Sequence, residues 1–153
     1  MYTFWQDFYS ENKLNITDFR QELESSEYVA CDVFFEGKNA KFRIAKITPK
    51  KVGQFVTLWR RESGGPIQPF SILDPIDFVI IAVNSGTHLG HFIFPKKILV
   101  EKGIFSNKKE GKRAFRVYPP WDSAKNMQAI KTQKWQLAYF ADFTNFEIKT
   151  KKL

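Results

Sequence analysis

The chain has 153 residues, of which 43% are hydrophobic and 16% aromatic, and its formal net charge is +8. This length is typical of one domain, and the apolar content excludes global disorder. No apolar run approaches the ~20 residues that cross a bilayer, and the N-terminus lacks the features of a signal peptide, so we expect a cytoplasmic protein without membrane insertion. The single cysteine, Cys31, rules out an internal disulfide, and we expect it to be buried and inert.

Apolar residues spaced four apart predict two helices within the N-terminal segment, residues 1–26. The first pair is Phe4 and Phe8, which gives a helix at residues 3–10. The second pair is Phe19 and Leu23, which gives a helix at residues 17–25, with Thr17 as its N-cap.

Six segments in the middle of the chain predict β-strands, because they are rich in Val, Ile and Phe and end near Gly or Pro. They are residues 28–35, 42–47, 54–60, 77–83, 91–94 and 114–118. The fourth of these is almost entirely apolar, which is typical of a central strand buried on both faces.

The C-terminal part predicts a short helix at residues 96–102, a long helix from residue 122 to about 142, a strand at 143–148 and a tail at 150–153. Strands and helices come in runs and do not alternate, which favours the α+β class. We therefore expect a single domain whose core, residues 27–149, is a mixed central sheet of about five to six strands flanked by helices.

The charge is unevenly distributed along the chain. Residues 38–61 hold eight Lys or Arg and no Asp or Glu, whereas residues 1–37 hold eight acidic and two basic residues. Apolar residues are interleaved with the basic run, so it is expected to fold and not to form a disordered tail. One electropositive face on a folded domain is typical of proteins that bind nucleic acids.

Five blocks of sequence resemble the MepB-like family and occur in the family's order. They are FRIAKITPKKVGQFVTLWRR, GPIQPF, HFIFPKKIL, GKRAFRVYPPWD and TQKWQL. The resemblance extends from about Glu27 to Tyr139. It implies a bacterial protein whose namesake is encoded beside a multidrug efflux pump and its repressor, and a restriction-endonuclease-like core of the PD-(D/E)XK type.

Nucleases of that type place an acid on a helix, an Asp on one strand and a (Glu/Gln)-x-Lys on the next, and their carboxylates hold a divalent metal. The resemblance assigns these catalytic roles to Glu24 or Glu27, to Asp32 and to Lys46. Ile44 stands where the second acid belongs, and isoleucine cannot ligate a metal. We therefore expect a degenerate centre without a metal or other cofactor, and Mg²⁺ only if the protein is an active nuclease.

Two groups of basic and aromatic residues predict a nucleic-acid interface. The first contains Lys46, Lys50, Lys51, Arg60 and Arg61 near Trp59, and the second contains Lys96, Lys97, Lys112, Arg113 and Arg116 near Trp121. Lys and Arg bind phosphates, and tryptophan rings stack on bases. The alternative for each group is a solvated basic face over core tryptophans.

From the sequence we expect a protein that binds DNA or RNA by contacting the nucleic-acid backbone. Its scaffold would be a degenerate nuclease-like one with little or no cleavage. One alternative is an active metal-dependent nuclease. Another is an accessory factor for drug efflux that binds a small molecule or a protein, with Gln68, Tyr118, Trp121 and Asp122 in its pocket. The oligomeric state and the preference for single or double strands stay open.

Overall fold

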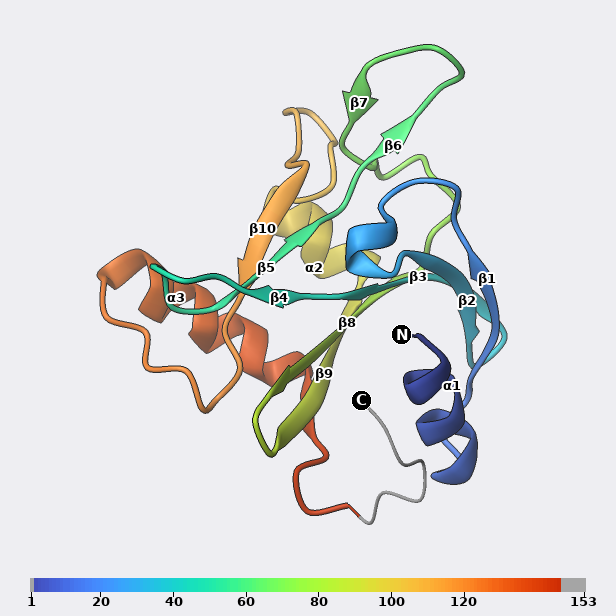
Figure 1. Ribbon diagram of the computed structural model, residues 1–153. Helices are drawn as coiled ribbons and strands as arrows, with labels where there is room; N and C mark the ends of the chain where they lie inside the picture. The colour runs from blue at the N-terminus through green and yellow to red at the C-terminus, as the bar shows by residue number, and fades with distance from the viewer. Residues whose placement is uncertain (1, 147–153) are drawn as a thin grey trace.

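A mixed sheet of six strands runs through the centre of the computed structural model, which describes residues 2–146 (Figure 1). Its strands, in spatial order, are β1 (Ile16–Gln21), β2 (Cys31–Phe35), β3 (Lys38–Ile44), β8 (Phe78–Ser85), β9 (His88–Pro95) and β11 (Phe140–Asp142). Strands β3 and β8 pair in parallel, and the other neighbours pair antiparallel. The α+β class and the mixed sheet predicted from the sequence are confirmed.

Strand β8 is buried on both faces, as its apolar run predicted. Val79, Ile81 and Val83 belong to one hydrophobic cluster, whereas Ile80 and Ala82 belong to another. This alternation follows from the period of two in a strand, which sends successive side chains to opposite faces. The central strand therefore joins the two halves of the core.

The parallel pair β3 and β8 is connected by a crossover that contains four short strands. Two of them, β4 (Lys46–Ile47) and β5 (Gln54–Thr57), form a three-stranded sheet with β10 (Ala114–Val117). The other two, β6 (Arg60–Arg61) and β7 (Ile67–Gln68), pair with each other. The basic stretch singled out in the sequence therefore lies mainly in this crossover, outside the large sheet.

Helices cover the two faces of the large sheet. Helix α1 (Tyr2–Glu11) packs its aromatic side chains on one face, and α2 (Lys96–Glu101) and α3 (Met127–Gln136) belong to the other side (Figure 1). Short 3₁₀ turns, η1 (Ser26–Tyr28) and η2 (Leu137–Tyr139), connect the elements. Within the described residues, no helix is long and apolar enough to span a membrane.

The predicted helix at residues 17–25 is wrong, because residues 17–21 belong to the edge strand β1 and residues 22–25 form a loop. Ile16 pairs with Phe35 of β2 and is buried, and Phe19 packs its ring against Phe42 at 5.1 Å between centroids. Leu23, the expected helical partner of Phe19, is fully exposed. A register shift between residues 17 and 20 interrupts the alternation that would have revealed a strand.

The predicted long helix at residues 122–142 is also wrong in extent. Helix α3 begins after Asn126, whose side chain accepts a hydrogen bond from the Ala129 amide at 2.8 Å, and β11 follows it. The predicted strand at residues 143–148 is not seen in residues 143–146, and its remainder and the tail lie outside the described residues. The predicted strand at residues 54–60 is divided into β5 and the start of β6.

A buried hydrogen bond joins helix α1 to the sheet. The Tyr9 hydroxyl lies 2.9 Å from Nδ1 of His91. Burial lowers the pKa of His91 from 6.5 to about 3 and raises the pKa of Tyr9, so both groups are neutral where they share this hydrogen bond.

Burial of neutral His91 predicts a loss of stability in mild acid. The unfolded chain binds a proton at His91 below about pH 6.5, whereas the folded protein binds it only near pH 3. The free energy of unfolding should therefore fall by about 2 kcal/mol between about pH 7.5 and pH 5. His91→Gln should remove this part of the pH dependence of the free energy of unfolding, which urea titrations at the two pH values measure. Equal slopes in the two proteins would contradict it.

Candidate functional site

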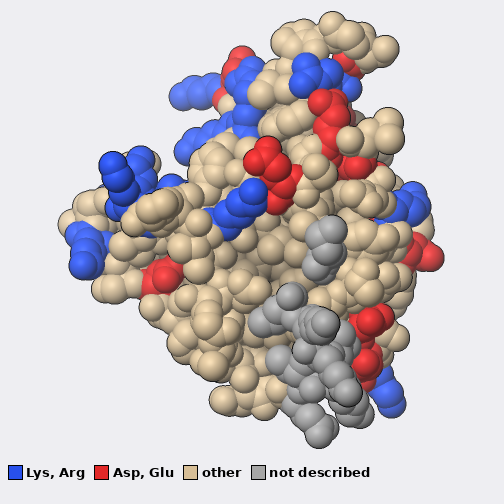
Figure 2. Space-filling model, viewed as in Figure 1, with Lys and Arg blue, Asp and Glu red and all other residues tan. Residues whose placement is uncertain are grey.

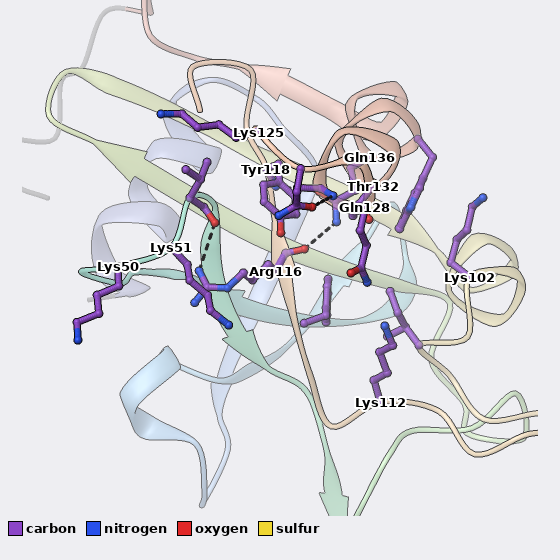
Figure 3. A pocket seen from close by; sticks show the side chains of 16 residues that line it. Lys50, Lys51, Lys102, Lys112, Arg116, Tyr118, Lys125, Gln128, Thr132 and Gln136 are labelled. Atoms are coloured by element: carbon purple, nitrogen blue, oxygen red, sulfur yellow. Dashed lines mark hydrogen bonds between the residues drawn. The ribbon is translucent and has the colours of Figure 1, made fainter. Parts of the chain in front are cut away.

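A pocket with a volume of about 570 Å³ lies between the three-stranded sheet and helix α3 (Figure 3). Its walls come from the loop between β4 and β5, the segment after α2, strand β10 and the first turns of α3. Six cations line it: Lys50, Lys51, Lys102, Lys112, Arg116 and Lys125. Among the described residues, no carboxylate lines this basic pocket.

The six cations of the basic pocket differ from six other Lys and Arg residues, which are ion-paired with Asp or Glu. Within residues 2–146, none of the six forms an ion pair. Figure 2 shows Lys and Arg at the left of the view, around the β4–β5 loop and α3, with acidic atoms beside them, and acidic and basic atoms are mixed over β6 and β7. Unbalanced like charges repel one another, so this part of the surface favours an anion.

Neutral groups hold Arg116 in the pocket wall. Its Nη2 donates to Thr48 Oγ1 at 2.9 Å, and its Nη1 donates to the Gly53 carbonyl at 3.3 Å. The guanidinium lies 5.6 Å from the centroid of the Phe55 ring. Since no carboxylate takes part in these contacts, the positive charge of Arg116 remains uncompensated.

Gln136 fixes helix α3 to strand β10 at the base of the pocket. Its side chain is fully buried, accepts from the Tyr118 amide at 2.8 Å and donates to the Arg116 carbonyl at 2.9 Å. On the other side, Gly53 has φ +86°, and a Cβ there would lie 2.6 Å from the Tyr118 ring. Glycine is therefore required for the close approach of the β4–β5 loop to Tyr118.

One face of α3 supplies the interior of the pocket. Gln128, Thr132 and Trp135 recur at helical spacing, so they point to the same side. Trp135 also packs against Phe94 at 5.5 Å, and Lys102 lies 5.7 Å from its ring. The interior thus combines aromatic carbon with amide and hydroxyl groups.

The structure brings together only part of the predicted nucleic-acid interface. Lys50 and Lys51 of the first predicted group meet Lys112 and Arg116 of the second in the basic pocket. Four other predicted cations are engaged in ion pairs among the described residues: Lys46 with Glu27 (3.7 Å), Arg60 with Asp74 (3.4 Å), Arg61 with Glu24 (3.2 Å) and Arg113 with Glu110 (2.7 Å). The fold therefore places some members of each predicted group in the basic pocket and others in ion pairs.

The remaining predicted residues lie outside the pocket lining. Lys96 donates to the carbonyls of residues 72 and 74, and Lys97 is exposed on α2. The Arg61 guanidinium lies 5.3 Å from the Trp59 ring centroid. Trp121 stacks on His88, with ring centroids 4.8 Å apart, and packs against the core. Neither tryptophan belongs to the basic pocket, whose ring systems are Phe115, Tyr118 and Trp135.

The fold divides the predicted catalytic residues: Glu24 and Asp32 line one hollow, whereas Glu27 and Lys46 lie outside its lining. Glu24 lies in a loop and Glu27 in η1, so neither is on the helix that the motif requires. Lys46 belongs to the three-stranded sheet and pairs with Glu27. The basic residue beside Asp32 is instead Lys41, whose Nζ lies 2.6 Å from Oδ1 of Asp32.

A charged cluster surrounds Asp32 on strands β2 and β3. The ammonium of Lys41 lies between Asp32 and Glu22, 3.7 Å from the latter, and the fully buried Arg43 donates to Glu22 at 2.6 Å. Lysine and arginine thus stand beside the carboxylates that a metal would need. In the described part of the chain, no three His, Cys, Asp or Glu side chains are grouped to hold a metal ion.

Sequence reasoning missed Lys102, Lys125 and the α3 face. The two lysines lie just beyond the ends of helices, away from the dense basic runs. The spacing of Gln128, Thr132 and Trp135 was a readable signal, because it marks a mixed polar and aromatic helix face.

Comparisons with known proteins identify a relative. A model of the MepB-like family matches residues 22–142. A crystal structure of MepB is similar to the chain with a TM-score of 0.82 and 38% sequence identity, covering 94% of this chain and 95% of that one. A search of curated protein sequences finds no match.

The charged cluster predicts that replacing two different glutamates will have very different effects on stability. Glu22→Gln removes the charge that compensates buried Arg43, so we expect a loss of about 3 kcal/mol in the free energy of unfolding. Glu24→Gln removes a partner of the more exposed Arg61 and should cost less than about 1 kcal/mol. Urea unfolding measures both, and equal effects would contradict the structural role of the Arg43 pair.

Proposed function

The chain belongs to the MepB-like family, and from the geometry of its basic pocket we propose that it binds nucleic acids through their phosphates. The observation that carries the proposal is the gathering of six cations around one hollow that no carboxylate lines. Within residues 2–146 none of these six forms an ion pair, unlike Arg60 and Arg113 outside the pocket.

Unpaired cations around a concave surface favour a polyanion for two reasons. Their like charges raise the local potential, which attracts anions from a distance. Each phosphate that they neutralise also releases condensed counterions, and this release drives binding most strongly at low salt. Contacts of this kind fix the position of the nucleic acid and do not read its sequence.

The proposal includes little or no cleavage. Asp32 accepts a short hydrogen bond from Lys41, Lys46 is paired with Glu27, and Ile44 stands at the place of the second acid in the nuclease motif. These contacts support binding over metal-dependent hydrolysis. A location in the bacterial cytoplasm, where DNA and RNA are available, is part of the same proposal.

Removing two pocket lysines should weaken binding in a salt-dependent way. For Lys50→Ala combined with Lys51→Ala, we expect lower affinity for a fluorescent oligonucleotide between about 50 and 200 mM salt. The slope of log affinity against log salt should decrease in magnitude by about one for each phosphate that the variant no longer binds. Fluorescence polarisation measures both quantities.

The matched control is Lys38→Ala combined with Lys131→Ala, which removes the same charge from exposed positions outside the pocket. It should leave affinity nearly unchanged. Equal weakening by the two double variants would show that only total charge matters.

Absence of salt-sensitive binding by the wild type would end the proposal, and a thermal shift with tetraphenylphosphonium alone would favour the efflux-linked alternative. Supercoiled plasmid should stay intact with Mg²⁺ or Mn²⁺.

A further inference from the structure

We infer that the basic pocket receives one nucleotide of a single strand, with the neighbouring phosphates held on its two opposite walls. The inference rests on the proposed function and adds the strandedness of the ligand. It follows from three features of the pocket: its size, the position of its cations and the chemistry of its interior.

The size of the pocket excludes the body of a duplex. A volume of about 570 Å³ is within the range of sites that enclose a small molecule. A double helix can place a base in such a hollow only by unpairing and unstacking it, which costs a few kcal/mol. A single strand presents its bases without that cost, so the concave shape favours single strands.

The cations stand on opposite sides of the hollow. Figure 3 shows Lys50, Lys51 and Arg116 on one side and Lys102 and Lys112 on the other. The first side is built by the β4–β5 loop and strand β10, and the second by the segments that follow α2 and precede β10. Two separate positive walls fit a ligand with two anionic groups, as consecutive phosphates of one strand provide.

The space between the walls suits a base. Gln128 and Thr132 lie there (Figure 3), and within residues 2–146 neither side chain forms a hydrogen bond, so both can bond the edge of a base. Tyr118 and Trp135 add ring carbon to the lining. Bases of every kind have a flat face that packs on aromatic carbon, so this interior accepts a nucleotide without strict choice of sequence.

Filling the hollow while keeping every cation tests the inference. Thr132→Trp places a large ring in the pocket, and Ile130→Trp, at an exposed helix position outside the lining, is the matched control. With a mixed-sequence strand of about 12 nucleotides, Thr132→Trp should lower affinity about five- to a hundredfold. Ile130→Trp should leave affinity unchanged, and the salt slope should be the same in both. Circular dichroism and thermal melting verify that each variant is folded.

The duplex of the same sequence separates this inference from the proposed function. The wild type should bind the single strand more tightly than the duplex, and thymidine 3′,5′-bisphosphate should displace the strand better than inorganic phosphate does. Single-strand affinity unchanged by Thr132→Trp would overturn the inference. Duplex affinity equal to that of the single strand would also overturn it, while leaving the proposed function standing if Lys50→Ala with Lys51→Ala still weakens binding. Absence of binding to either the single strand or the duplex would overturn both the inference and the proposed function.

Discussion

The parallel pairing of β3 with β8 is the constraint on which the rest of the structure depends. Antiparallel strands can be joined by a tight turn, whereas parallel strands need a connection of a dozen or more residues. Here the connection contains β4, β5, β6 and β7 in place of a long helix. Strands β3 and β8 are neighbours in the large sheet, so the connection cannot lie between them. Its strands β4 and β5 instead form a second sheet with β10. The basic pocket lies between that sheet and α3.

This crossover also decides what happens to the basic run at residues 38–61. In the sequence the run is one block, but the fold sends its members to different surroundings. Arg43 is buried beside Glu22, Arg61 reaches Glu24, and Lys50 and Lys51 stand at the turn between β4 and β5 without an ion pair among the described residues. Linear charge density is therefore a poor guide to surface potential, because acids distant in sequence neutralise some cations and leave others.

Sequence patterns predicted the elements whose signals are local. Strand β8 follows from its apolar run, α1 from Phe4 and Phe8, and the ends of several strands from Pro and Gly. Strand β1 could not be read in this way, because its bulge removes the alternation and its residues are held by tertiary pairing with β2. The presence of Lys125 in the same pocket as Lys50 depends on the packing of α3 against β10, which no local pattern contains.

Two kinds of scaffold hold charge in this protein, and they have opposite consequences. Around Asp32 and Glu22, cations and carboxylates form ion pairs with one another, so their charges offset and attract little from outside the fold. Around the pocket, the supports are neutral: Gln136 bonds backbone groups of β10 and the residue after it, and Arg116 is held by a hydroxyl and a carbonyl. A neutral scaffold fixes the geometry of the cations without cancelling their field. Positive charge that is positioned but not compensated is what a phosphate-binding surface requires.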